Sequence, residues 1–213
     1  MTLRARVLDA LGTVYDPELD EPITTLGFVG SCVVGARAVE VRLRLPTPQC
    51  APNFAFLMAA DAGAAVRAVA GDRSVSVILE DHYTRTEING AVNRGEGFAD
   101  AFPGETTGDL EALRRLFQRK ALLARQSRLL SVPATRLGEL TGPDAERCRE
   151  LRRALGIDAS DDAPPFVTGD GAPVDVSDVR FRRMASLTAL SLETNGGMCR
   201  DLLRTRYGEE VAA

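Results

Sequence analysis

The chain has 213 residues, of which 45% are hydrophobic and 26% charged, the composition of a folded globular protein. Trp is absent and aromatic residues make up 5%, so stacking surfaces for single-stranded nucleic acid are not expected. The formal net charge of −4 also argues against a nucleic-acid binder, which needs a basic surface to replace the counterions around phosphates.

Apolar residues nowhere form the run of about 20 that spans a bilayer, and residues 1–11 lack the long apolar stretch of a secretory signal. We therefore expect a cytoplasmic protein without a membrane partner. The cysteines are scattered and form no CxxC pair, so free thiols are expected rather than a self-contained zinc site. They are Cys32, Cys50, Cys148 and Cys199.

The first 80 residues alternate between helical and strand patterns. Residues 3–14 place leucines and valines on one helical face, with Thr2 available as N-cap. Short Val- and Leu-rich runs at 27–35 and 39–45 predict an antiparallel hairpin. A helix is expected over 52–69 and a third strand over 74–80. The order α-β-β-α-β predicts a two-layer α+β domain with its helices on one face of a small sheet.

The rest of the chain reads as a mainly helical extension. Residues 81–108 show no clear periodicity and predict a long loop. Helices are expected over 109–130, 143–155 and 176–194, with a connector at 157–175. Asn195-Gly196-Gly197 predicts a helix break, followed by a short helix that carries Cys199 to Tyr207. The expected organisation is a domain over 1–80, a loop over 81–108 and a client-binding extension over 109–213.

Two short segments carry residue types suited to chemistry. Asp16-Pro17-Glu18-Leu19 stands where the first helix is expected to end, and Thr47 to Pro52 stands where the second strand turns into the second helix. Pro52 suits the first helical position, which puts Cys50 just ahead of a helix N-terminus. The dipole there favours a thiolate, which is a nucleophile or a soft metal ligand. We expect the two segments to meet at one edge of the sheet, with Asp16 and Glu18 near Cys50.

The order of these motifs resembles the MIP18 family, also called DUF59. The residues that carry the resemblance are DPEL at 16–19, LGFV at 26–29, an alternating strand and TPQC at 47–50. Members of the family include factors for iron–sulfur cluster assembly and companions of bacterial multicomponent oxygenases. The resemblance covers roughly residues 3–80 and departs from the family pattern at Pro46 and Ala51. It implies a characteristic cofactor-binding cluster at Asp16, Glu18, Leu19, Thr47 and Cys50, with Cys50 and Glu18 as candidate metal ligands.

Each candidate residue also has a plainer interpretation. Cys50 could be a small, partly buried residue at a helix start. Asp16 could act as a structural cap and Glu18 could lie in an ordinary turn, while Thr47 is expected to fix its loop through a hydrogen bond to backbone. His82, the only histidine, is a candidate ligand for iron or zinc, although a lone histidine is more often a hydrogen-bonded residue.

Cys199 repeats the expected setting of Cys50, because it follows two glycines and precedes a short helix. The glycines alone, however, could account for that pattern by breaking a helix. The sequence therefore leaves the role of Cys199 open.

Three functions compete. The first is a non-enzymatic maturation factor that holds iron or an iron–sulfur cluster transiently through Cys50 and passes it to a client metalloprotein, with a homodimer or other assembly factors completing the coordination. The second is a metal-free adaptor that acts through the helical extension. The third, and weakest, is a thiol enzyme with Cys50 as nucleophile and His82 as base. No phosphate-binding loop, serine elbow or dinucleotide fingerprint supports other enzyme classes.

Overall fold

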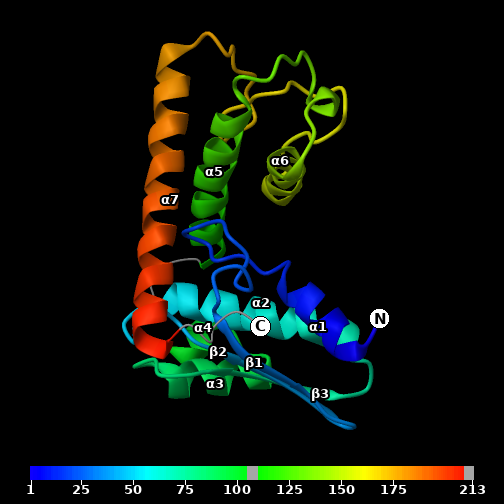
Figure 1. Cartoon of the computed structure of the whole chain (residues 1–213), viewed down its shortest axis with the longest axis vertical. Coiled ribbons are helices and arrows are strands. Elements are labelled where there is room, and N and C mark those ends of the chain that lie inside the picture. The colour runs from blue at the N-terminus through cyan, green and yellow to red at the C-terminus, as the bar shows by residue number, and fades with distance from the viewer. Residues whose placement is uncertain (105–109, 209–213) are drawn as a thin grey trace. The chain divides into compact units, whose positions relative to one another are not determined.

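The computed structural model describes residues 1–104 and 110–208 (Figure 1). It divides into two compact units. Unit one comprises Met1–Leu110 together with Gly196–Ala213, and unit two comprises Glu111–Asn195. The carboxyl-terminal residues thus belong to the first unit and not to the predicted extension over 109–213.

Unit one is built around a three-stranded sheet in the order β1-β2-β3. Strands β1 (Val29–Val34) and β2 (Ala38–Leu43) form the predicted antiparallel hairpin. Strand β3 (Ser74–Leu79) pairs parallel to β2, and helix α2 (Pro52–Ala70) makes the crossover between them. Helix α1 (Leu3–Leu11) precedes β1 in the chain. The order of the elements therefore confirms the predicted α-β-β-α-β unit and the α+β class.

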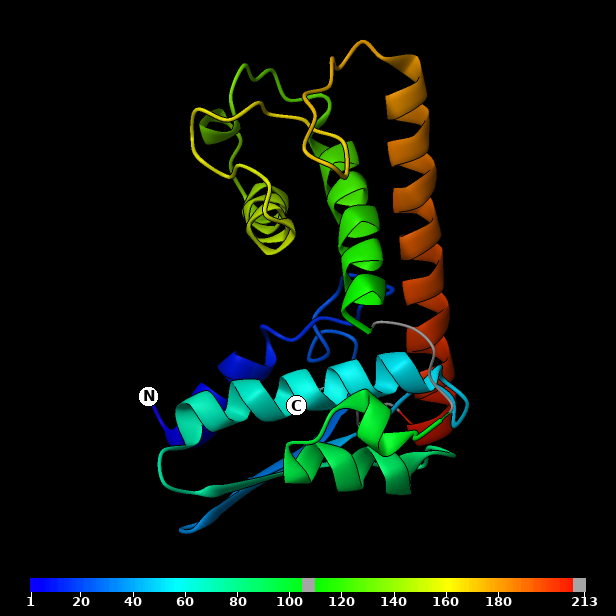
Figure 2. The ribbon, with the colours of Figure 1, turned by 180° about the vertical axis from the view of Figure 1, so that it is seen from behind.

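The two faces of the sheet differ in polarity. Side chains of β2 alternate, so Val39, Val41 and Leu43 are buried while Glu40 and Arg42 lie on the opposite face. Helices α1 and α2 cover the buried face (Figure 2). The sheet therefore has one apolar face covered by helices and one charged face.

The prediction of a long loop over 81–108 is wrong for residues 81–104, and residues 105–108 lie outside the described residues. The segment contains helix α3 (Arg85–Arg94) and the short helix α4 (Phe98–Ala101). Ile88, Ala91 and Val92 recur at helical spacing and are buried in the first core. This apolar pattern is weak in the sequence, because the other residues of α3 are mostly polar. Two of them, Asn89 and Asn93, have a structural role.

Those asparagines close the open edge of β3. The Asn93 side chain accepts a hydrogen bond from Val77 N–H at 2.9 Å and donates to the Val77 carbonyl at 2.8 Å. Asn89, one helical turn earlier, does the same with Leu79, at 2.8 and 3.1 Å. Each primary amide replaces the backbone of a neighbouring strand, so the outward N–H and C=O groups of Val77 and Leu79 are satisfied without a fourth strand.

Unit two has its own core. Helix α5 (Leu110–Leu129) and helix α6 (Pro143–Leu155) lie close to their predicted ranges, with a 3₁₀ turn at Leu137–Glu139 between them. The connector predicted over 157–175 forms no helix, but Phe166 and Val167 are buried in this core. The buried guanidinium of Arg152 orders the connector by donating to the Pro164 and Pro165 carbonyls, each at 2.8 Å.

Helix α7 (Val179–Tyr207) is continuous, so the predicted break at residues 195–197 is wrong. A glycine inside a helix costs about 1 kcal/mol relative to alanine, a penalty that packing can outweigh. Gly196 is buried, and a Cβ added there would lie 2.8 Å from Glu21 Oε1. The glycine thus permits close approach to the 16–21 turn instead of ending the helix.

Within residues 1–104 and 110–208, one helix passes a length and composition test for a membrane span. It is α2, and half of the tested window is buried in the core of unit one. An apolar core helix passes the same test, so this is weak evidence for a membrane segment.

Candidate functional site

Asp16 organises the turn that follows α1. Its Oδ1 atom accepts hydrogen bonds from the Glu18 and Leu19 amides at 2.8 and 2.9 Å, and its own amide donates to the Glu21 carbonyl at 2.9 Å. Burial raises the pKa of Asp16 to about 6, and the two amide bonds only partly offset that effect. The structure therefore gives Asp16 the capping role that the sequence offered as its plainer interpretation.

Cys50 lies where the sequence places it, immediately before the N-terminus of α2. The helix begins at Pro52 with Ala51 as N-cap. The Thr47 hydroxyl accepts from the Gln49 amide at 3.3 Å and lies 3.7 Å from the half-buried Sγ of Cys50. Thr47 thus fixes the loop and touches the thiol at the same time.

His82 fastens the same loop from the other side. Its Nε2 lies 2.8 Å from the Cys50 carbonyl, and its Nδ1 lies 3.2 Å from Thr84 N and 3.0 Å from Thr84 Oγ1. A carbonyl only accepts and an amide N–H only donates, so Nε2 carries the proton and Nδ1 accepts. Burial lowers the pKa of His82, which favours this neutral ring.

This arrangement differs from both chemical roles considered for His82. Both ring nitrogens are engaged, so a metal ligand at His82 would have to displace one of these bonds. The ring bonds the backbone of Cys50 and not its thiol, so it is not placed as the base of a Cys–His pair. His82 instead positions the Cys50 loop.

A second thiol reaches this region from α7. Cys199 is half-buried and packs against the first core, as Cys50 does. Burial, followed by the negative charges of Asp16, Cys50 and Glu18, raises the pKa of Cys199 to about 11. The Cys199 thiol therefore lies within electrostatic range of Cys50, Asp16 and Glu18. No sequence motif assigns a role to Cys199, although its spacing from Leu203 and Tyr207 is that of one helix face.

The end of α7 is held at the 16–21 turn by an ion pair. Arg200 Nη1 lies 2.6 Å from Glu21 Oε2, and both side chains are partly shielded from solvent. Leu203, one turn later, is buried in the first core. The end of α7 is thus held by an ion pair at Arg200 and, one helical turn later, by apolar packing at Leu203.

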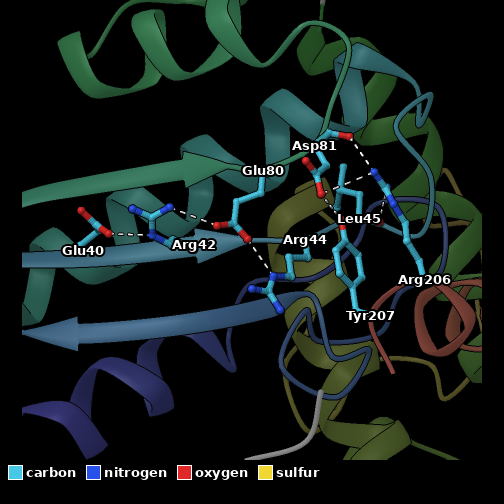
Figure 3. Close-up of polar contacts among 8 residues, drawn as sticks. All are labelled: Glu40, Arg42, Arg44, Leu45, Glu80, Asp81, Arg206 and Tyr207. Atoms are coloured by element: carbon cyan, nitrogen blue, oxygen red, sulfur yellow. Dashed lines mark hydrogen bonds and ion pairs between the residues drawn. The ribbon is translucent and has the colours of Figure 1, made fainter. Parts of the chain in front are cut away.

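A second anchor lies at the other end of the Cys50 loop (Figure 3). The Arg206 guanidinium donates to the carbonyls of Leu45 and Asp81, at 3.3 and 3.2 Å. The Tyr207 hydroxyl donates to Asp81 Oδ2 at 3.2 Å. Leu45 precedes the Cys50 loop and Asp81 precedes His82, so the carboxyl-terminal turn joins the two segments that hold Cys50.

The charged face of the sheet continues toward this anchor. Glu80 accepts from Arg42 at 3.1 Å and from Arg44 at 2.7 Å, and Arg42 also bonds Glu40 at 2.8 Å (Figure 3). Burial raises the pKa of Glu80, but the hydrogen bonds from the two arginines outweigh it, so the net shift is downward. The Arg44 side chain passes over Gly30, where an added Cβ would lie 2.7 Å from its Nε.

No three His, Cys, Asp or Glu side chains in residues 1–104 and 110–208 converge closely enough to hold a metal ion. The composite site of Asp16, Glu18 and Cys50 therefore stays a prediction, and the described residues alone do not form a coordination shell. The donor set suits iron, which takes thiolate ligands in clusters. Any ion or cluster bound here would need further ligands from sulfide or from another chain.

Comparison with known proteins bears on the first part of the chain. Residues 4–77 match the family model described as iron-sulfur cluster assembly protein. The match includes Asp16, Glu18, Thr47 and Cys50, and it ends before His82 and Cys199. Neither the curated proteins nor the solved structures gave a match.

Proposed function

We propose that this chain, whose residues 4–77 form a domain of the iron–sulfur cluster assembly family, is a maturation factor that carries iron or an iron–sulfur cluster to a client metalloprotein. The observation that supports this most is the setting of Cys50, half-buried at the N-terminus of α2 in a loop fixed by Thr47 and His82. Thiolates are the protein ligands of iron–sulfur clusters. The cluster is cargo, held transiently.

The partial donor set supports a role in delivery. A chain that supplies few ligands leaves the rest of the coordination to a second copy or to the recipient, and so allows the cargo to leave. We include in the proposal a homodimer, a cytoplasmic location and the absence of an enzymatic reaction. The family resemblance favours an iron-dependent multicomponent oxygenase as client, with other assembly factors as further partners.

Unit two has a surface suited to recognising a client. A hollow of about 460 Å³ lies beside the end of α5 and is lined mainly by apolar side chains, among them Leu130, Val132, Pro133, Phe166 and Val176. Pockets of this volume lined by apolar groups are typical of binding sites. The proposed client segment is therefore an apolar one.

The test is reconstitution of the purified full-length protein with iron and sulfide in the absence of oxygen. Iron and acid-labile sulfide are measured per chain for wild type, Cys50→Ala and Cys32→Ala. We expect wild type and Cys32→Ala to retain both, and Cys50→Ala to lose most of both. Cys32 is the matched control, because it is also a half-buried thiol but lies in β1. Equal retention of iron and sulfide by wild type and Cys50→Ala would contradict the proposal.

The alternative is a metal-free adaptor. It is favoured by the separate core of unit two and by exposed apolar side chains of α7 such as Leu187 and Leu190. An iron-dependent oxygenase component serves as test client for both functions. Activation of that client by Cys50→Ala at the wild-type level, combined with its loss in Val132→Asp, would favour the adaptor over the carrier.

A further inference from the structure

The carboxyl-terminal part of α7 presents one face to the Cys50 region. Residues three, four and seven apart share a helix face, and six residues of α7 follow this spacing. They are Gly196, Cys199, Arg200, Leu203, Arg206 and Tyr207. Five of them make the approach, ion pair, burial and hydrogen bonds described above, and the sixth is Cys199.

Contacts on this face lie on both sides of Cys199. Before it, Gly196 approaches Glu21, where an added Cβ would lie 2.8 Å from Oε1. After it, Arg200 pairs with the same Glu21, and Arg206 bonds the carbonyls of Leu45 and Asp81 beside the Cys50 loop. Cys199 therefore lies on the face that runs from the 16–21 turn to the Cys50 loop, and both Cys199 and Cys50 pack against the first core.

The electrostatics agree with this placement. The negative charges of Asp16, Cys50 and Glu18 contribute to the raised pKa of Cys199. These residues belong to the Asp16 turn and the Cys50 loop. Cys199 is half-buried and is not in a disulfide. It is thus a free thiol brought to the candidate site by a helix that lies outside the matched family region.

We infer that Cys199 is a second protein ligand and that Cys50 and Cys199 together supply the thiolate pair for one iron of the cargo. Each thiol gives its proton to solvent as its sulfur bonds the iron. This inference rests on the proposed function. In a cysteine-ligated [2Fe–2S] cluster four thiolates serve two irons. One chain then supplies the ligands of one iron, and a second copy or the client supplies those of the other.

Cobalt(II) ions are the probe, because they take thiolate ligands and report them through an intense sulfur-to-metal charge-transfer absorption. The full-length protein is titrated without oxygen, as wild type and as Cys50→Ser, Cys199→Ser and Cys32→Ser. Wild type and Cys32→Ser should give the same spectrum and affinity. Cys50→Ser and Cys199→Ser should each lose about half of the charge-transfer intensity and bind at least about tenfold more weakly.

The outcomes separate the two proposals. Loss in Cys50→Ser with a wild-type result for Cys199→Ser overturns the inference on Cys199 alone. Wild-type results for both variants overturn the metal-carrying function as well.

A measurement on the wild-type protein removes any dependence on how the variants fold. Alkylation by iodoacetamide is followed at each cysteine by mass spectrometry with and without cobalt(II). Protection of both Cys50 and Cys199 by at least about tenfold, with Cys32 unchanged, is the expected result, whereas a Cys199 that reacts at the same rate with and without the ion overturns the inference.

Discussion

The Nε2–H group of His82 donates to the carbonyl oxygen of Cys50 across 2.8 Å, which ties the start of the α3 segment to the loop before α2. His82→Ala removes this bond and leaves the partly buried Cys50 carbonyl without it, so the unfolding free energy should fall by about 1–2 kcal/mol. Alkylation of Cys50 should become several-fold faster as the loop loosens. Tyr83→Phe, at the exposed neighbouring position, should leave both quantities unchanged.

His82 also predicts a pH dependence. Its pKa is lowered from 6.5 in the folded chain, so the folded state binds fewer protons at this site than the unfolded state does. Its contribution to the unfolding free energy is therefore complete above pH 6.5 and is lost as the pH falls below that value. Urea unfolding across pH 7 to 5 should show this loss in wild type and a weaker one in His82→Gln. Parallel curves would contradict the assignment.

Asp16 predicts the opposite slope. Its folded-state pKa is raised from 3.8 to about 6, so the folded state holds the proton more tightly and this group's contribution falls as the pH rises from about 4 to 6. Asp16→Asn keeps an oxygen that accepts from the Glu18 and Leu19 amides but carries no charge. It should match wild type near pH 4 and be more stable by roughly 1–3 kcal/mol at pH 7.

The matched variant Asp16→Ala removes the cap itself, at a cost of about 1–2 kcal/mol near pH 4. Thermal unfolding of the three proteins at the two pH values separates charge from capping. An Asp16→Asn variant that is less stable than wild type at pH 7 would contradict the prediction. It would show that the hydrogen bonds of the ionised carboxylate outweigh the cost of burying its charge.

Arg206 is expected to stabilise the Cys50 loop from a distance along the chain. Arg206→Ala removes the bonds to the Leu45 and Asp81 carbonyls, so the unfolding free energy should fall by about 1–2 kcal/mol and Cys50 should alkylate faster. Arg204→Ala is the control, because Arg204 pairs with Asp201 on the exposed side of the helix and such pairs contribute little. Equal effects of the two variants would refute the anchoring role.

Glu80 should contribute to stability only where it is ionised. Burial opposes its ionisation, but the bonds from Arg44 and Arg42 lower its pKa, so its contribution is present above pH 4.5 and is lost below it. Glu80→Gln should reduce the unfolding free energy by about 0.5–1 kcal/mol at pH 7, since the pairs are partly exposed. Denaturant midpoints of the two proteins should converge as the pH approaches 3.

Local signals predicted much of unit one. Thr2 caps α1 by accepting from the Ala5 amide at 3.2 Å, and Pro52 begins α2, as their residue types and positions indicated. Both features depend on neighbours within one helical turn. The same holds for the hairpin of β1 and β2, whose alternation is visible in the chain itself.

The errors arose where distant residues decide. Gly196 and Gly197 predict a break by their own propensities, but the contacts of Gly196 and Arg200 with Glu21 come from the opposite end of the chain. The sequence does not indicate the helix over Arg85–Arg94, because Asn89 and Asn93 are residue types typical of loops. Their role in the helix depends on hydrogen bonds to the backbone of β3. The role of Cys199 is hidden for the same reason, since nothing near it in sequence indicates Cys50.

The hydrogen bonds of Asn89 and Asn93 to β3 make the two edges of the sheet differ in their ability to pair with a further strand. Because β2 is central and Asn93 and Asn89 occupy the outward groups of Val77 and Leu79, a strand from another molecule finds this part of the β3 edge blocked, whereas β1 is the other edge of the sheet. Association of this sheet with a strand is therefore directional: it adds at one edge and cannot continue through the other. The edge-to-edge pairing of sheets that leads to fibres is thereby hindered at β3.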